Sequence, residues 1–219
     1  YAKEIYLAAK NGGTEFASNA QLKRLVDRAK KEQVPSDIIK RAIDKAKGGS
    51  MESYYPVRYE GFGPSNSMLI IECLTDNENR TMTAVKIALT KTGCKLGVAG
   101  CVRHMFDYYA VFTFKGMTEE EAFEAVMMAD CEVEDIQMED GLTTVYAQSA
   151  DYQAVRDALV AAKPDLEFVE DLVTYVPQNT VTLTDEKEIA QFKRLQEMLD
   201  DIDDVQDFFH NVVDLPEEE

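Results

Sequence analysis

The sequence has little of the chemistry on which most enzymes depend. It contains two histidines, His104 and His210, and neither lies beside a serine, cysteine or aspartate motif that would indicate an activated nucleophile. Gly61-Phe62-Gly63 lacks the third glycine of a dinucleotide-binding loop, and no stretch resembles a Walker loop. These absences predict that the protein is not an enzyme.

Cysteine and long apolar runs are also scarce. The four cysteines form no C-x-x-C pair and have no histidine at metal-ligand spacing: Cys73, Cys94, Cys101 and Cys131. We therefore expect buried thiols of a cytoplasmic protein that holds no metal and no cofactor. The longest apolar run, residues 68–71, is far shorter than the roughly 20 residues that span a bilayer, so we expect neither a membrane helix nor a signal peptide.

Positive charge is lacking over most of the chain. Residues 1–48 hold eleven Lys/Arg and six Asp/Glu, a charge of +5, whereas residues 49–99 are neutral. Residues 100–219 hold seven basic and thirty acidic residues, a charge of −23. A basic block set apart from an acidic body can approach phosphates while the rest repels them. An ordinary solvated helical surface would explain the same block equally well.

The first third of the chain has helical periodicity. Asn19 is placed as an N-cap before an apolar stripe at i, i+3, i+4 and i+7 spacing: Leu22, Leu25, Val26 and Ala29. A second start signal at residues 35–37 precedes a similar stripe: Ile39, Ala42, Ile43 and Ala46. We predict a small helical domain over residues 1–48, followed by a hinge at Gly48-Gly49-Ser50.

Residues 108–177 contain a complete β-α-β-β-α-β pattern, typical of the ferredoxin-like split-βαβ arrangement. Thr118 and Glu121 predict a capping box at the start of the first helix. The alternation slips near Glu134-Asp135, which suggests a bulge in the second strand. The expected elements are strand 109–114, helix 119–129, strands 131–138 and 142–147, helix 151–162 and strand 166–176.

The flanking segments predict a second unit of the same kind. Residues 68–74 form a continuous apolar run, as expected of a central strand buried on both faces. The expected elements are strand 68–74, a helix from residue 77 to Gly93, strands 101–106 and 180–183, a helix capped by Thr184, and strand 205–212. We therefore predict an α+β protein in which domain 108–177 is inserted into a discontinuous middle domain, residues 49–107 plus 178–219.

One segment of the middle domain combines turn residues with polar groups. The glycines and proline of Arg58-Tyr59-Glu60-Gly61-Phe62-Gly63-Pro64 favour a fixed turn against the sheet. Asn77, Asn79 and Arg80 bring amide and guanidinium groups to a helix N-terminus, where anions are favoured. The alternative is that these side chains only cap the helix.

The motifs R-Y-E-G-F-G-P (58–64) and E-C-L-T-D-N-E-N-R-T (72–81), and the run from Gly93 to Gly100 that leads into Met105-Phe106, resemble the YebC/PmpR family. V-P-S-D-I-I-K-R-A-I-D-K-A-K-G-G (34–49) extends the resemblance over nearly the whole chain, closest to the YeeN branch. Family members begin with a strongly basic stretch that has no match here. They also usually carry a few more residues between the counterparts of Lys3 and Glu4.

The resemblance implies three domains, with the third inserted in the second, and cytoplasmic work linked to nucleic acid. Bacterial members are described as regulators of transcription. Mitochondrial relatives are described as translational activators of cytochrome oxidase subunit synthesis. The resemblance thus implies promoter binding or, alternatively, action at the ribosome to relieve stalled synthesis.

The leading hypothesis is a non-enzymatic regulator that binds DNA or structured RNA through its helical domain. The candidate phosphate-binding residues are Lys23, Arg24, Lys30, Lys31, Lys40, Arg41, Lys45 and Lys47. The candidate motif and interdomain residues are Arg58, Tyr59, Glu60, Gly61, Gly63, Asn77, Asn79, Arg80 and Thr81. No helix-turn-helix or RNA-stacking motif indicates which bases are read, which favours recognition by shape and charge.

Two other classes of function stay open. The acidic inserted domain could dock a basic protein such as a ribosomal protein, although solubility alone explains any single carboxylate. Its carboxylates gather around one expected hairpin: Glu132, Glu134, Asp135, Glu139 and Asp140. An enzyme requires a cleft that brings Arg80, Asn77 and Glu60 together with a perturbed carboxylate. We expect a monomer with no membrane partner.

Overall fold

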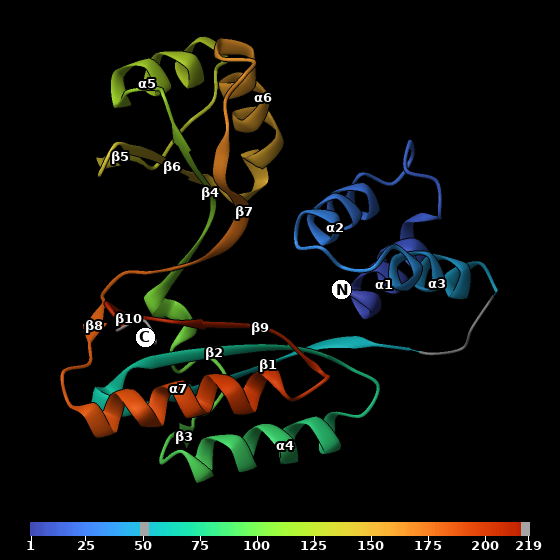
Figure 1. The fold of residues 1–219 in the computed structure, drawn as a ribbon, viewed down its shortest axis with the longest axis vertical. Coiled ribbons are helices and arrows are strands. Elements are labelled where there is room, and N and C mark those ends of the chain that lie inside the picture. The colour runs from blue at the N-terminus through green and yellow to red at the C-terminus, as the bar shows by residue number, and fades with distance from the viewer. Residues whose placement is uncertain (49–52, 216–219) are drawn as a thin grey trace. The chain divides into compact units, whose positions relative to one another are not determined.

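The structure is a computed structural model that describes residues 1–48 and 53–215 (Figure 1). The chain divides into two compact units, residues 1–103 with 181–219, and residues 104–180. The expected hinge begins at Gly48, and its other two residues, Gly49 and Ser50, lie outside the described residues. Among the described helices, none combines the length and apolar character needed to cross a membrane.

Three helices form the N-terminal part of the first unit: α1 (Ala2–Gly12), α2 (Ala20–Lys31) and α3 (Ser36–Lys47). Their shared core contains Ile5 and Tyr6 of α1, Leu22 and Val26 of α2, and Ile39 of α3. Both expected apolar stripes are thus confirmed. Helix α1 runs without a break through Lys3 and Glu4.

Asn19 is confirmed as the N-cap of α2. Its side-chain oxygen accepts a hydrogen bond from the backbone N–H of Leu22 at 3.0 Å. Its amide nitrogen donates to the carbonyl oxygens of Ala8 and Gly13, both at 2.8 Å. This buried side chain therefore both starts α2 and ties it to the end of α1.

The middle part of the first unit is an antiparallel sheet with strand order β3-β1-β2-β9. Two helices, α4 and α7, share one core with it through residues such as Leu69, Val85 and Phe192. Strand β2 is buried on both faces, because its consecutive residues Leu69, Ile70 and Ile71 are all fully buried, as expected. The elements are β1 (Tyr55–Phe62), β2 (Met68–Thr75), α4 (Glu78–Lys91), β3 (Lys95–Leu96), α7 (Glu186–Asp200) and β9 (Val205–His210).

This sheet has the ferredoxin-like order, but one of its strands comes from an unexpected segment. Strand β1 lies between β2 and β3, in the position expected for the strand at residues 180–183, and pairs with β2 from Tyr55↔Thr75 to Phe62↔Met68. The turn expected over residues 58–64 is therefore wrong for most of its length. Only the short connection after β1 turns, where the Gly63 N–H donates to the Ser67 carbonyl at 2.8 Å.

Two further expectations for the flanking segments are wrong, and a third is confirmed only in part. Residues 103–105 form a 3-10 turn instead of a strand, and the next strand begins at Phe106. The strand expected at residues 180–183 is present as β8 (Val181–Thr182), but it pairs in parallel with β10 (Val212–Val213) in a separate two-stranded sheet instead of joining the four-stranded one. Helix α7 is capped by Asp185 instead of Thr184, since the Asp185 carboxylate accepts from the N–H groups of Lys187 and Glu188.

The second unit confirms the predicted β-α-β-β-α-β order, with strand order β5-β6-β4-β7. The capping box of α5 is confirmed, since the Glu121 N–H donates to Thr118 Oγ1 at 3.2 Å and the Thr118 N–H to Glu121 Oε2 at 2.8 Å. The elements are β4 (Phe106–Lys115), α5 (Glu119–Met128), β5 (Asp135–Glu139), β6 (Leu142–Gln148), α6 (Tyr152–Ala162) and β7 (Phe168–Pro177).

The bulge expected at Glu134-Asp135 is wrong. Strand β5 begins at Asp135 and keeps a regular register with β6, from Asp135↔Tyr146 to Glu139↔Leu142. The slip in alternation therefore marks the start of the strand. The irregularity in this sheet instead falls between Thr113 and Phe114, where β4 pairs with β7.

Candidate nucleic-acid interface and the Asp204 network

The eight basic residues expected to contact phosphates are all exposed on α2 and α3. The buried positions of these helices are apolar, Leu22, Val26 and Ala29 in α2 and Ile39 and Ala42 in α3. Because an α-helix turns about 100° per residue, the residue after a buried position lies at the flank of the apolar stripe. Long basic side chains at such positions extend into solvent.

The two helices carry the same cationic pattern. The apolar stripes of α2 and α3, taken one at a time, do not show this repeat. Residues 22–30 read L-K-R-L-V-D-R-A-K, and residues 39–47 read I-K-R-A-I-D-K-A-K. Five of the nine positions are identical, and the other four exchange apolar for apolar or basic for basic. Since Leu22 and Ile39 occupy equivalent buried positions, each helix presents a lysine pair seven residues apart at the same angle to its core stripe.

Most of these cations are not held by strong partners. Arg41 forms an i,i+4 ion pair with Asp37 at 3.3 Å, and both side chains are well exposed. Exposed pairs of this type contribute only about 0.3–0.5 kcal/mol, so a phosphate can replace the carboxylate at little cost. Among the residues that the structure describes, Lys23, Lys30, Lys40 and Lys47 take part in no ion pair.

The motif residues from Arg58 to Gly63 lie in strand β1 or directly after it. Arg58 pairs with Glu72 across β1 and β2 at 3.0 Å, and Tyr59 is buried in the core of the sheet. At Gly61 a Cβ atom would lie 2.5 Å from the carbonyl oxygen of Lys95 on β3, so only glycine permits this strand pairing. At Gly63 a Cβ atom would lie 2.6 Å from Ser67 Oγ, in the connection to β2.

The Glu60 carboxylate holds a loop against β1. It is 5% exposed and accepts hydrogen bonds from the backbone N–H groups of Gly100 and Val102 at 2.8 Å and of Arg103 at 2.9 Å. Burial by itself raises the pKa of Glu60, but these three bonds outweigh it and hold the pKa below its usual value. The three N–H groups explain why residues 101–103 do not continue as a strand.

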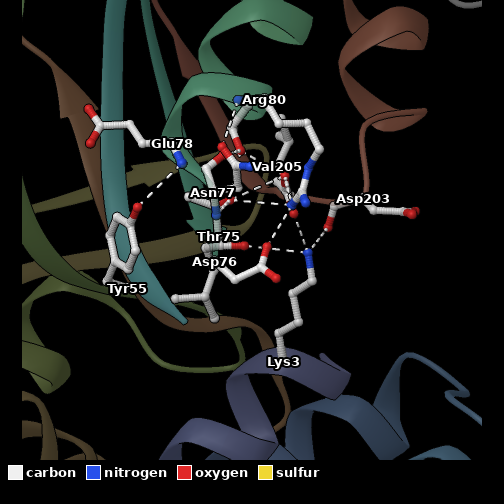
Figure 2. A network of polar contacts seen from close by, with 12 residues as sticks. Lys3, Tyr55, Thr75, Asp76, Asn77, Glu78, Arg80, Asp203 and Val205 are labelled. Carbon is white, nitrogen blue, oxygen red and sulfur yellow. Dashed lines mark hydrogen bonds and ion pairs between the residues drawn. The ribbon is translucent and has the colours of Figure 1, made fainter. Parts of the chain in front are cut away.

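Two of the remaining motif residues, Arg80 and Thr81, contact Asp204, which lies between α7 and β9. Figure 2 shows Asn77 and Arg80 at the start of α4, with Lys3 and Asp203 close by. Asn77 caps α4 by accepting from the Arg80 N–H at 3.1 Å. The Arg80 guanidinium donates to Asp76 Oδ1 and to Asp204 Oδ2, both at 2.8 Å. The Thr81 hydroxyl donates to the same Asp204 oxygen at 2.7 Å.

Lys3 of α1 completes this network. Its ammonium group lies 2.6 Å from Asp204 Oδ1 and 2.9 Å from the carbonyl oxygen of Asp203. Asp204 is 5% exposed, and burial alone would raise its pKa; the bonds from Lys3, Arg80 and Thr81 instead hold the pKa well below its usual range. One ionised carboxylate therefore joins the first helix of the chain to α4 and to the loop before β9.

The anion expected at the start of α4 is thus supplied within the chain by Asp204. Asn77 has the capping role that was the alternative, and Arg80 is bonded to two carboxylates. For Asn79, the structure shows its carbonyl oxygen accepting from Thr83 Oγ1 at 2.8 Å. Sequence reasoning missed Asp204 and Lys3, because they are 201 residues apart and neither lies in a recognisable motif.

The cysteines show no sign of activation. Cys73, Cys94 and Cys131 are buried as expected, whereas Cys101 is half-buried. Burial raises the pKa of Cys73 to about 12, so its thiol stays protonated at neutral pH, unlike a nucleophilic cysteine. Within the described part of the chain, no three His, Cys, Asp or Glu side chains are grouped as metal ligands.

Comparison with known proteins covers nearly the entire chain. Residues 1–49 match the family model of the TACO1/YebC protein N-terminal domain, and residues 54–212 match that of the TACO1/YebC second and third domain. A probable transcriptional regulatory protein of Alteromonas mediterranea is 51% identical over 213 residues, which cover 97% of this chain and 88% of that protein. One of Marinobacter nauticus is 49% identical over 218 residues, covering 100% of this chain and 90% of the relative.

A solved structure has the same fold. The crystal structure of a conserved hypothetical protein from Aquifex aeolicus superimposes with a TM-score of 0.77 at 30% sequence identity. The match covers 99% of this chain and 88% of the Aquifex chain.

Proposed function

This chain belongs to the TACO1/YebC family, and on that premise we propose that it is a cytoplasmic, non-enzymatic regulator of gene expression that binds nucleic acid through α2 and α3. Its relatives named probable transcriptional regulatory proteins support a regulatory role. The observation that carries the proposed binding mode is the repeated cationic pattern of residues 22–30 and 39–47 on two exposed helical faces. Such lysines bind phosphates without reading sequence.

Binding to duplex DNA, measured by fluorescence anisotropy at several salt concentrations, tests this mode. If the four lysines of the two pairs each contact one phosphate, the logarithm of the binding constant should fall with the logarithm of the salt concentration with a slope of about −3.6. Replacing the α3 pair, Lys40→Gln with Lys47→Gln, removes two contacts and is expected to change the slope to about −1.8. The equivalent α2 pair, Lys23→Gln with Lys30→Gln, is expected to have the same effect because the pattern repeats.

A matched control is available on α4 of the same unit. Lys86 and Lys91 are exposed there, and Lys86→Gln with Lys91→Gln makes the same change of net charge away from α2 and α3. This control is expected to leave the salt slope within about 0.5 of the original value. Salt-insensitive binding, no binding to any nucleic acid, or an equal effect of the control pair would overturn the proposed interface.

A second candidate function is a ribosome-associated translation factor that contacts structured RNA. It is favoured by the same cationic pattern, because contacts from these side chains to phosphates do not depend on base sequence, and a structured RNA offers phosphates as readily as a duplex does. The same titration with a folded RNA and with purified ribosomes separates the two candidates. Tighter binding to ribosomes than to duplex DNA at equal salt supports translation, and the reverse supports transcription.

A further inference from the structure

The sheet of the second unit is covered by helices on one face. Helices α5 and α6 share a core with alternate residues of the central strands, among them Ala110, Phe112 and Phe114 of β4 and Val145 of β6. Since successive strand residues point to opposite faces, Tyr109, Val111 and Thr113 point to the other face. Helices α5 and α6 therefore do not cover this second face, on which Val111 and Thr113 are buried and Tyr109 is half-buried.

Aromatic and apolar side chains form a row across this second face. Val111 of β4 lies directly opposite Tyr146 of β6 and Leu172 of β7. The rings of Tyr146 and Tyr109 meet edge to face with centroids 6.4 Å apart. Each of the two central strands thus contributes one half-buried tyrosine to the middle of the face. We call this set the tyrosine face: Tyr109, Val111, Tyr146 and Leu172.

Carboxylates border the tyrosine face on both sides. Asp135 of β5 lies opposite Tyr146, and Glu139 lies opposite Leu142. Glu170 of β7 accepts a hydrogen bond from the Thr113 hydroxyl at 3.1 Å. Burial and then the nearby Glu170, Asp135 and Glu139 raise the pKa of Tyr146, which is consistent with these carboxylates lying around its ring.

The charge of the unit decides what such a face can bind. Residues 104–180 hold seventeen Asp/Glu and three Lys/Arg, a net charge of −14. Tyrosines on two central strands would suit stacked bases, but a field of this sign repels the phosphates that a nucleic acid brings with it. A guanidinium group can stack on a tyrosine ring and bond to a flanking carboxylate at the same time.

We propose that the tyrosine face, bordered by Asp135, Glu139 and Glu170, is a docking site for an arginine-rich segment of a protein partner. This site lies on a different unit from α2 and α3 and recognises charge of the opposite sign. It therefore goes beyond the nucleic-acid binding proposed above and does not depend on it.

The probe for the test is a fluorescent peptide of alternating arginine and serine, added to the full chain. A peptide with citrulline in place of arginine keeps the shape but removes the charge. We expect the arginine peptide to bind and to shift the amide NMR signals of Tyr109, Val111 and Tyr146, whereas the citrulline peptide does neither. Tyr146→Ala is expected to weaken binding by at least about fivefold, whereas Tyr146→Phe, which keeps the ring, stays within about twofold.

Matched charge variants separate docking from general attraction to an acidic protein. Asp135→Asn with Glu170→Gln neutralises two carboxylates at the tyrosine face, and Glu120→Gln with Glu124→Gln neutralises two exposed ones on α5. We expect the first pair to weaken binding by about tenfold and the second by less than twofold. The signal mapping on the unsubstituted chain keeps the test valid if a tyrosine variant fails to fold.

Several outcomes would overturn the proposal. These are no binding of the arginine peptide, equal binding of the citrulline peptide, or equal losses in the two charge-matched pairs. Shifts of the tyrosine-face signals by an oligo-uridine probe, without shifts by the peptide, would assign the face to nucleic acid instead. Failure of duplex binding through α2 and α3 would leave each of these outcomes unchanged, so the two proposals fail separately.

Discussion

Replacing the Asp204 carboxylate with an amide of the same shape, Asp204→Asn, is expected to destabilise the first unit. The side chain of Asp204 is 7% exposed and receives hydrogen bonds from Lys3, Arg80 and Thr81. An asparagine offers one acceptor oxygen, and its amide group would face one of the donors. Hydrogen bonds to charged groups contribute about 1.5–3 kcal/mol each, and losing one partner of a buried pair costs about 3–5 kcal/mol.

The expected loss of unfolding free energy in Asp204→Asn is smaller than the sum of these hydrogen-bond and ion-pair energies. The Lys3 side chain is 22% exposed and that of Arg80 is 54% exposed, so both cations regain water when the carboxylate is lost. We therefore expect Asp204→Asn to lower the free energy of unfolding of this unit by about 2–3 kcal/mol. With a urea dependence of about 2.5 kcal/mol per molar, this moves the unfolding midpoint down by about 1 M.

The pH dependence gives this prediction a second readout. The pKa of Asp204 is lower in the folded chain than the value of about 3.9 in an unfolded one, so folding favours the ionised form. Its contribution is therefore complete above about pH 4 and is lost as the pH falls through the depressed folded value. The difference between the original chain and Asp204→Asn should stay constant from pH 8 to pH 5 and shrink below pH 4.

Urea unfolding followed by circular dichroism at several pH values measures both effects. The variant Asp203→Asn is a suitable control, because Asp203 takes part in this network through its backbone oxygen. A loss below about 0.5 kcal/mol for Asp204→Asn, or a difference that persists unchanged at pH 3, would refute the reasoning from charge-assisted bonds.

Three other predictions concern a strand contact, a loop and the cysteines. Gly61→Ala should lower the free energy of unfolding in urea by about 1–3 kcal/mol, because a Cβ atom would lie 2.5 Å from the Lys95 carbonyl oxygen. The control Gly48→Ala, where a Cβ atom would have its nearest contacts at 3.7 Å, should change stability by less than about 0.5 kcal/mol, and equal effects of the two variants would contradict the steric argument. Glu60→Gln should speed amide hydrogen exchange at Gly100, Val102 and Arg103, whose N–H groups donate to the carboxylate. In the original chain, exchange at these three residues should become faster as the pH falls through the depressed pKa of Glu60. Unchanged exchange would show that the carboxylate does not hold the loop. At pH 8, iodoacetamide should label Cys101 before the three buried cysteines. Cys73 should react very slowly because its pKa is raised to about 12. Mass spectrometry that finds Cys73 labelled first would refute this order.

Local patterns allowed much of the fold to be predicted. The stripe from Leu22 to Ala29, the cap at Asn19 and the capping box of Thr118 with Glu121 each depend on residues within two turns of helix. The predicted element order of the second unit was correct because its strands and helices carry local signals, although the strand expected at residues 131–138 is observed at 135–139. Fold class and helix positions therefore need little information from distant parts of the chain.

Strand β1 and the Asp204 network could not be predicted in this way. Pro56, Glu60 and Gly61 are poor strand formers in isolation, and they lie in a strand because β2 pairs along the whole of β1 and β3 pairs with its last two residues. The expected strand at residues 101–106 is absent because the Glu60 carboxylate takes up the N–H groups of residues 100, 102 and 103. Asp204 acquires its role only when residues 3, 80 and 81 come together, and no local spacing records that approach.

The position of the cations in the first unit affects how the salt titration can be read. Lys3 belongs to the Asp204 network, whereas the lysine pairs of α2 and α3 are exposed and unpaired within the described structure. Exposed charges are screened over a Debye length of about 8 Å at physiological ionic strength, but partly buried pairs are screened much less. Raising the salt concentration should therefore weaken phosphate binding at α2 and α3 well before it loosens α1 from Asp204. Circular dichroism and the Asp204→Asn variant check this separation: if that variant alters the salt slope as strongly as Lys40→Gln with Lys47→Gln does, the helices need the network in order to bind.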